Sequence, residues 1–226
     1  MVIVKSKDGS HTLFVPELNE HYHSTFGAIQ ESNFIFIESG FHHVTQFHPF
    51  PPEEPLRILE IGFGTGLNAL LTQIEAEKLG QPVYYTSIEA FPLSYETWMA
   101  LNYPHQFCSL DYSPVFHHLH TADWNKAEII SSHFTLHKIH GRIEDFLPES
   151  NFFSLIYFDA FGPDVQPELW TAEIFQRIYN SLIPGGVLVT YSVKGDVIRA
   201  MKSVGFQTEK LPGPPGKRHI LRATKK

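Results

Sequence analysis

A carboxylate follows a run of strand-forming residues in the second half of the chain. Residues 152–158, FFSLIYF, predict a buried strand, and Asp159 comes directly after it, followed by Ala-Phe-Gly-Pro. Burying a charge without a partner is costly, so Asp159 is not expected to contribute to the packing of the strand. Asp159 either caps the turn at Pro163 or faces a ligand beyond the end of the strand, and we favour the ligand.

A glycine-rich turn lies nearer the N-terminus, at residues 59–68, LEIGFGTGLN. A turn of this kind between a strand and a helix brings backbone N–H groups close to a ligand. Its spacing is Gly-x-Gly-x-Gly, whereas dinucleotide-binding proteins carry Gly-x-Gly-x-x-Gly. Glu60, two residues before the first glycine, would repel a pyrophosphate but suits a cationic amino-acid ligand. The turn therefore resembles motif I of class I S-adenosyl-L-methionine-dependent methyltransferases, which predicts that cofactor.

Several side chains are predicted to contact this cofactor. Those of the turn are Glu60, Gly62, Phe63, Gly64, Thr65, Gly66 and Asn68. A second acid, Glu89, ends the β-rich segment 83–88, and an acid at that place accepts the ribose hydroxyls in nucleoside-binding α/β folds. Tyr22, from the N-terminal segment, either covers the cofactor or is simply buried.

Helices and strands alternate through the middle of the chain. Strands are predicted at residues 56–61, 83–88, 136–139, 152–158 and 187–193, and helices at 67–79, 93–101 and 168–182, the last ended by Pro-Gly-Gly. This alternation predicts an α/β domain with a mainly parallel sheet. Residues 1–55 are expected to be an irregular N-terminal extension packed on the core domain, 56–226, and to end in a Pro/Glu linker. Residues 103–136 support no assignment.

The end of the chain predicts an antiparallel hairpin, with strands at 206–211 and 219–223 around PGPPGKR. A seven-stranded class I methyltransferase sheet ends in such a hairpin, whose loop emerges on the ligand side. Lys217 and Arg218 in this loop, together with Lys194, are predicted to contact phosphates beside the methyl donor.

Asp159 is the predicted catalytic residue. In a doubly wound sheet its strand lies beside the first strand, so Asp159 faces the reactive end of the cofactor. A nitrogen that accepts a methyl group must be unprotonated, and a carboxylate there can take the proton. Phe161 and Pro163 are predicted to form a wall that positions the acceptor.

The charge of the chain is unevenly distributed. Residues 194–226 hold nine Lys/Arg and two Asp/Glu, whereas the whole chain holds 17 and 24, for a net charge of −7. The C-terminal segment is therefore basic on an acidic body. This asymmetry suits an anionic partner such as nucleic acid, and a solvated lysine-rich surface explains it equally well.

Composition favours a single soluble domain. The chain has 226 residues, lacks an apolar run long enough to span a membrane, and begins without the apolar core of a signal peptide. Its lone cysteine, Cys108, fits a reducing compartment, so a cytoplasmic protein is expected. The 14 histidines show no spacing typical of a metal-ligand set, and no metal site is predicted.

Four motifs together carry a more specific resemblance: EIGFGTGLN, FDAFGPDVQPELWT, YSVKG and GPPGKRHILRA. With the N-terminal PELNEHYHSTFGAIQESNFIFIESG, they resemble the methyltransferase domain of the tRNA 5-methylaminomethyl-2-thiouridine biosynthesis family MnmC, and its stand-alone MnmD-like members. The resemblance implies methyl transfer to the aminomethyl group of a modified wobble uridine in tRNA. It also implies a catalytic role for Asp159 and cofactor contacts for Glu60, Gly62, Gly64, Gly66 and Glu89.

The sequence departs from the family pattern at Gly141-Arg142, where many relatives carry Gly-Asp near the adenine amino group. We expect either that Asp145 substitutes for that acid or that Ile143 contacts adenine through its backbone. The flavin-dependent domain of the bifunctional enzyme has no counterpart in these residues, so an oxidoreductase or another aminomethyl-generating enzyme is expected to act upstream. The alternative function is N-methylation of a small amine or of a protein.

Overall fold

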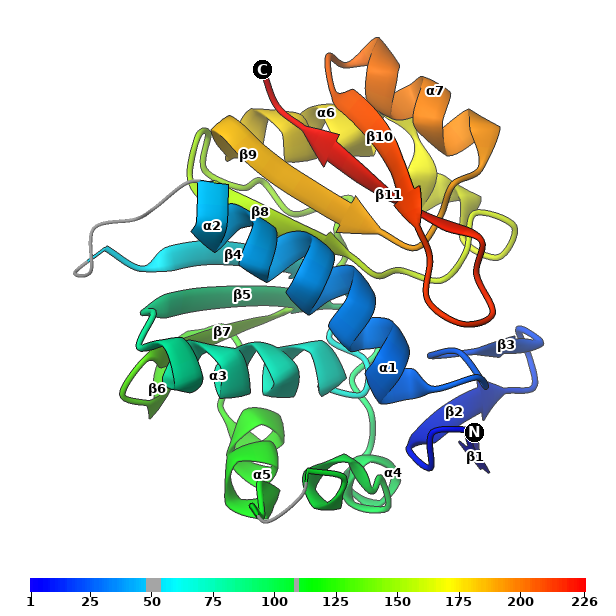
Figure 1. Ribbon diagram of the computed structural model, residues 1–226, viewed down its shortest axis with the longest axis vertical. Coiled ribbons are helices and arrows are strands. Elements are labelled where there is room, and N and C mark those ends of the chain that lie inside the picture. Colours follow the sequence, from blue (N-terminus) through cyan, green and yellow to red (C-terminus); the bar gives the residue numbers. More distant parts are fainter. Residues whose placement is uncertain (48–53, 108–109) are drawn as a thin grey trace.

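An eight-stranded sheet forms the centre of the computed structural model, which describes residues 1–47, 54–107 and 110–226 (Figure 1). Its strands are β4 (Leu56–Ile61), β5 (Val83–Glu89), β6 (Lys126–Ser131), β7 (Phe134–His140), β8 (Phe153–Phe158), β9 (Leu182–Thr190), β10 (Gln207–Pro212) and β11 (His219–Thr224). Their order is β10-β11-β9-β8-β4-β5-β7-β6.

Five neighbouring strands of this sheet, β7, β5, β4, β8 and β9, are parallel. At one edge β11 is antiparallel to β9 and β10 is antiparallel to β11, which is the predicted hairpin. The predicted seven-stranded α/β sheet is thus present. The eighth strand, β6, pairs antiparallel with β7 at the other edge. It lies in the stretch that the sequence left unassigned, because none of its residues is buried and they carry little apolar pattern.

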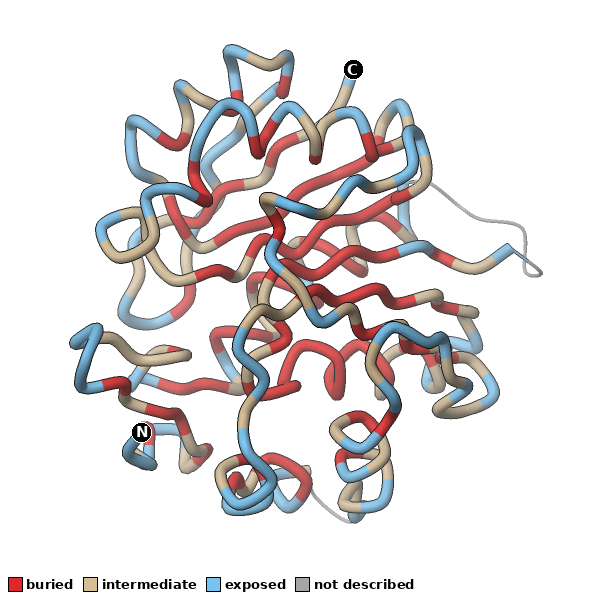
Figure 2. Tube along the Cα trace, turned by 180° about the vertical axis from the view of Figure 1, so that it is seen from behind, coloured by how far each residue is buried: buried red, intermediate tan, exposed pale blue. Residues whose placement is uncertain are grey.

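Helices cover both faces of the sheet. One face carries α3 (Leu67–Leu79) and an N-terminal helical segment made of α1 (Ala28–Ser32), η1 (Asn33–His42) and α2 (His43–Phe47), while α6 (Ala172–Ser181) and α7 (Gly195–Ser203) cover the other (Figure 1). Alternate residues of each central strand point to opposite faces: Leu155 and Tyr157 of β8 join the first core, and Ile156 and Phe158 join the second. Both faces of the central strands are therefore buried (Figure 2).

The expectation that residues 1–55 are irregular was wrong. Three short antiparallel strands, β1 (Val2–Lys5), β2 (His11–Val15) and β3 (Glu20–His21), precede the helical segment. The sequence did not predict the helix because η1, NFIFIESGFH, has π-helical turns and gathers most of its apolar residues in one run, FIFI, so it lacks the usual 3.6-residue pattern. Of the predicted linker, residues 51–53 lie outside the described residues, as does Cys108.

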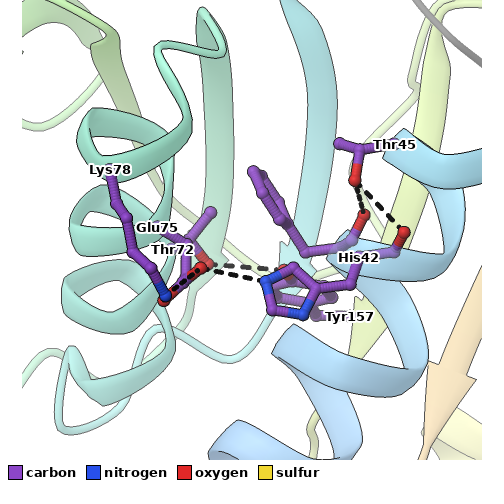
Figure 3. A network of polar contacts seen from close by, with 7 residues as sticks. His42, Thr45, Thr72, Glu75, Lys78 and Tyr157 are labelled. Atoms are coloured by element: carbon purple, nitrogen blue, oxygen red, sulfur yellow. Dashed lines mark hydrogen bonds and ion pairs between the residues drawn. The ribbon is translucent and has the colours of Figure 1, made fainter.

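The helical segment is fastened to the rest of the core. His42 Nε2 lies 2.9 Å from Glu75 Oε2 of α3, and Lys78 Nζ donates to the same carboxylate (Figure 3). Gly40 lets η1 lie close to the sheet, since a Cβ there would sit 3.0 Å from a methyl group of Val189. The N-terminal residues are therefore packed against α3 and β9.

Other boundaries differ from expectation by a few residues. The predicted helix 168–182 is a short turn, η3 (Pro167–Trp170), followed by α6, and Pro-Gly-Gly belongs to β9 instead of separating it from the helix. Leu182 already pairs with Phe153 of β8, so β9 begins earlier than predicted. The predicted helix 93–101 is reduced to α4 (Tyr95–Met99), and two further helical pieces, η2 (Tyr103–His105) and α5 (Ser113–Thr121), follow it. No helix in the described parts of the chain is long and apolar enough to cross a membrane.

Candidate active site

A cavity of about 760 Å³ lies beyond the carboxyl ends of β4, β5 and β8. The residues just after these strands, Gly62, Ala90 and Asp159, all line it. In the sheet, β4 has β5 on one side and β8 on the other, so successive strands of the chain are added on opposite sides of β4. Open α/β sheets bind ligands at such a reversal of strand order. Residues 20–26 and the β10–β11 loop close over it. Its volume falls within the range of small-molecule sites, about 300–1,000 Å³.

The glycine-rich turn forms the floor of the cavity. Gly64 has φ +49°, and a Cβ on it would lie 3.0 Å from the ring of Tyr22. The Gly64 N–H donates to Glu89 Oε2 at 2.9 Å, so the turn after β4 is held by the acid that ends β5. Glycine is required here both by the left-handed backbone and by the close approach of Tyr22.

Two histidines that the sequence did not single out hold the middle of this turn. His23 Nε2 lies 2.7 Å from Thr65 Oγ1, and His120 Nε2 donates to the Thr65 carbonyl at 3.1 Å. Burial lowers the pKa of His23 to about 4 and that of His120 to about 3, so both are neutral near pH 7. The ring of Trp98 stacks on His120 at 4.5 Å. Thr65 is therefore clamped between the N-terminal segment and α5.

Glu89 is presented to the cavity as a fixed acceptor. Besides the Gly64 N–H, its carboxylate accepts the Phe91 N–H through Oε1 at 2.8 Å. Each carboxylate oxygen keeps a further lone pair, so Glu89 can still accept two hydroxyl groups. This geometry supports the predicted ribose contact.

The remaining walls of this half of the cavity fit the rest of the predicted cofactor. Ile88 and Ile143 are buried apolar residues on its lining, and of the two candidates near Arg142 only Ile143 lines it, whereas Asp145 does not. Asn68 also lines the cavity and offers a polar side-chain amide to the amino-acid end of the cofactor. These residues fit S-adenosylmethionine, with Glu89 for the ribose, the isoleucines for the adenine and Asn68 for the amino-acid end.

Glu60 is placed differently from its predicted role. Its side chain is fully buried, it does not line the cavity, and its Oε2 accepts from Ser87 Oγ at 2.6 Å. Burial raises the pKa of Glu60 to about 8, with the nearby Asp159 charge adding to the effect. The carboxyl group therefore lies behind the turn in its protonated form near neutral pH. A direct contact of Glu60 with the cofactor stays a prediction that this placement does not support.

Asp159 lines the cavity and links the glycine-rich turn, through Asn68, to the residues that follow β8. Asn68 Nδ2 donates to Asp159 Oδ2 at 2.8 Å, which orients the carboxylate. Burial raises the pKa of Asp159 well above its usual value, and the negative charge of Glu31 raises it further against the opposing effects of Asn68 and Lys217. A carboxylate with a raised pKa is a stronger proton acceptor than a solvated one.

Aromatic side chains wall the space around Asp159. Phe161 lines the cavity, its ring lies edge-on to Tyr22 with centroids 5.0 Å apart, and its carbonyl accepts from Trp170 Nε1 at 2.8 Å. Tyr191, which the sequence did not indicate, donates its hydroxyl to the Ala160 carbonyl at 2.8 Å. Pro163 does not line the cavity, and its predicted contact with the acceptor stays a prediction.

The three cations predicted to contact phosphates do not all line the cavity. Lys217 lines the cavity and pairs with Glu31 of α1 at 3.2 Å, an acid that the sequence did not indicate. Lys194 and Arg218 are exposed and lie outside the lining, and Lys194 pairs with Asp164. Gly66 is also outside the lining, whereas Gly62, Phe63, Thr65 and Tyr22 belong to it.

The sheet order, the glycine turn, Glu89 and the acid after β8 together define a nucleoside-binding enzyme of the class I methyltransferase type. The chain belongs to the S-adenosyl-L-methionine-dependent methyltransferase family whose model matches residues 114–226. Its cofactor is S-adenosyl-L-methionine, which carries the transferred methyl group on a sulfonium.

Individual relatives identify the family more narrowly than the family model does. The chain is 30% identical over 217 residues to the tRNA 5-methylaminomethyl-2-thiouridine biosynthesis bifunctional protein MnmC of Aromatoleum aromaticum, covering 89% of this chain and 32% of that protein. It is 27% identical over 237 residues to the MnmC of Actinobacillus pleuropneumoniae, covering 96% and 34%. The chain thus spans about a third of the length of these relatives, and the resemblance indicated by its motifs is confirmed.

A solved structure, MnmC2 of Aquifex aeolicus, shares the fold. It superposes with a TM-score of 0.79 at 24% identity, covering 99% of this chain and 70% of that chain. The overlap includes the N-terminal segment as well as the sheet.

Proposed function

We propose that this chain transfers a methyl group to the amine of an aminomethyl group on a modified wobble uridine in tRNA, forming 5-methylaminomethyl(-2-thio)uridine. The observation that carries the proposal is Asp159, a buried carboxylate oriented by Asn68 at the junction of the cofactor site and the aromatic-walled space. The similarity to MnmC proteins, which are named for the biosynthesis of this nucleoside, supports the substrate.

The charge of the cavity lining supports an amine as the acceptor. Among the residues that the structure describes, six acids line it: Glu20, Glu31, Glu89, Glu144, Asp159 and Glu168. The two Lys/Arg residues of the lining are already paired, Arg142 with Glu144 and Lys217 with Glu31. A cavity with this balance attracts a cation, and an aliphatic amine arrives as an ammonium at neutral pH.

Asp159 prepares this ammonium for the reaction. Its carboxylate takes one proton from the nitrogen, which frees the lone pair that forms the new carbon–nitrogen bond. Bound S-adenosylmethionine would supply the methyl group and keep the electron pair of the broken carbon–sulfur bond on sulfur, so charge would balance. Phe161 and Tyr191 exclude water around the nitrogen and hold it in line with the methyl group, and such alignment is a large part of catalysis of this kind.

The basic C-terminal segment supports a polyanionic substrate outside the cavity. Arg218 is exposed beside the cavity-lining Lys217, and Lys194 forms a surface ion pair with Asp164, which is weak. We propose that these cations contact tRNA phosphates. The aminomethyl group itself would be produced by an oxidoreductase or other enzyme acting upstream.

The test is methyl transfer from labelled S-adenosylmethionine to bulk tRNA from cells lacking this gene. Wild type should label wobble uridine, and Asp159→Ala should not. Raising the salt concentration should weaken tRNA binding, and Arg218→Ala should reduce the dependence on salt, because each phosphate contact releases about one counterion. Cofactor binding without any label in tRNA would overturn the proposal.

A second candidate is N-methylation of a small amine, and the acidic lining favours it as well. The two functions separate on salt: transfer to a small amine should change little between low and high salt, whereas transfer to tRNA should fall steeply.

A further inference from the structure

Glu31 brings a second carboxylate to the acceptor side of the cavity. It is only 8% exposed, lines the cavity from α1, and is fixed through Oε2, which accepts the Ser24 N–H at 2.7 Å. Its other oxygen, Oε1, is buried and has no hydrogen bond among the described residues. Lys217 reaches it there, with its Nζ 3.2 Å away.

Lys217 completes a cradle with an aromatic ring. Its Nζ lies 4.7 Å from the centroid of Tyr191, within the range of a cation–π contact. Tyr191 is itself fixed by the hydrogen bond from its hydroxyl to the carbonyl of Ala160, the residue after Asp159. A buried carboxylate on one side and an aromatic face on the other are the chemistry that recognises an ammonium ion.

The group that fills this cradle has the chemistry of the proposed acceptor. Lys217 carries a primary amine on an alkyl stem, and the aminomethyl group is also a primary alkyl amine. Lys217 is 31% exposed at its side chain and comes from the β10–β11 loop, which descends toward α1 in Figure 1, so it can leave towards solvent without disturbing the sheet.

We propose that Glu31 and the Tyr191 ring form the binding site for the ammonium of the acceptor, and that Lys217 occupies this site until the acceptor enters. The inference rests on the proposed function for the identity of the acceptor. The displaced Lys217 then stands beside Arg218 at the mouth of the cavity, where a phosphate replaces Glu31 as its partner. Glu31 selects an amine, and Asp159 deprotonates it.

The test compares binding of two nucleosides, 5-aminomethyluridine and the neutral 5-hydroxymethyluridine, to the protein saturated with S-adenosylhomocysteine. Wild type should prefer the amine by ~10-fold, the size of one charge-assisted contact. Glu31→Gln should abolish the preference. Lys217→Met should tighten binding of the amine several-fold, because it removes the internal competitor. Glu149→Gln and Lys202→Met, both exposed and outside the lining, are the matched controls.

The two variants should change the affinity for the amine in opposite directions. This difference distinguishes an ammonium-binding site from a purely structural ion pair. If the pair only latches α1 to the loop, both variants should weaken nucleoside binding, and either that result or an unchanged affinity in Lys217→Met overturns the proposal. A measurement on wild type covers the case in which a variant does not fold. Acetylation of Lys217, followed by mass spectrometry, should accelerate when 5-aminomethyluridine is added, and an unchanged rate contradicts displacement.

Failure of this site and failure of the proposed function give different results. Methylation of tRNA with the same KM in Glu31→Gln as in wild type sinks the ammonium site and leaves the function standing. Amine-selective nucleoside binding that depends on Glu31, without labelling of tRNA, keeps the site and overturns the substrate.

Discussion

The two halves of the cavity are built in different ways. The cofactor half comes mainly from two adjacent stretches, the turn after β4 and the end of β5, with Gly64 bonded directly to Glu89. The acceptor half is assembled from segments far apart in the chain: Asp159 after β8, Tyr191 after β9, Glu31 on α1 and Lys217 between β10 and β11. A fold built in this way can keep its cofactor while its acceptor changes.

Asp159→Asn tests whether the halves separate, and its effect should be the largest. The variant keeps the size of the side chain and a carbonyl acceptor for Asn68 but cannot take a proton. We expect methyl transfer to fall by ~10²–10⁴-fold while the Kd for S-adenosylmethionine, measured by calorimetry, changes little. Asp145→Asn, exposed and outside the lining, should behave as wild type. An equal loss of cofactor affinity in Asp159→Asn would place this acid in the cofactor half.

Gly64→Ala should damage the cofactor half in turn. Its Cβ would press on Tyr22, and its backbone has φ +49°. Gly80→Ala is a matched control, because Gly80 has φ +64° but nothing within 4 Å of a Cβ. Both should lose about 1–2 kcal/mol of stability from the left-handed backbone, but only Gly64→Ala should lose affinity for S-adenosylmethionine, by at least ~10-fold. Similar affinities in the two variants would contradict the tight contact with Tyr22.

The histidines around Thr65 should make the cofactor half sensitive to acid. Their pKa values in the fold, about 4 for His23 and about 3 for His120, lie below the unperturbed 6.5, so the unfolded chain binds more protons in between. Their contribution to stability is therefore full above pH 6.5 and is lost as pH falls towards 4. At pH 5 the loss should be about 2 kcal/mol per histidine.

Melting temperatures of wild type and of His23→Gln/His120→Gln, measured from pH 7 to pH 4.5, check this. The double variant should show a shallower fall by several degrees. The difference between the two proteins matters, because buried Glu60 has a slope of opposite sign. Parallel curves would show that these histidines titrate normally.

Glu60→Gln should have the smallest effect on the binding of the cofactor. Because the pKa of Glu60 is raised from 4.5 to about 8, the stability that its protonated form confers is present below pH 4.5 and is lost as pH rises through 8. Glutamine cannot ionise, so the variant should gain about ten degrees of melting temperature relative to wild type at pH 8 and much less at pH 5. Its affinity for S-adenosylmethionine should stay within about threefold of wild type. A larger loss would restore Glu60 as a cofactor contact.

The sequence predicted best the parts whose signals are local. The strand Leu56–Ile61 and the helix Leu67–Leu79 lie at the predicted residues, because a short apolar run, a glycine turn and a final Gly80 in the left-handed region mark their ends. Gly62, Gly64 and Glu89 line the cavity and were also predicted from local signals. The two glycines follow the strand β4, and Glu89 ends the strand β5.

What the sequence could not supply depends on contacts between distant residues. Glu31 and Lys217 meet only because α1 and the β10–β11 loop converge at the cavity, and no spacing in the chain records that. Glu60 shows a limit of the motif: the motif places this residue on the right strand, but the direction of its side chain, towards Ser87, is decided by the pleat of β4 against β5.

The pairing of α1 with the β10–β11 loop also bears on the order in which the molecule assembles. Residues near opposite ends of the chain close the acceptor side, and such long-range closure carries the largest loop entropy and forms after nearby contacts. The strands around β4 are buried on both faces, whereas Lys217 and its loop are partly exposed. In native-state hydrogen exchange, amides of the loop should therefore exchange well before those of β4, so acceptor entry can use a local opening that leaves the cofactor enclosed.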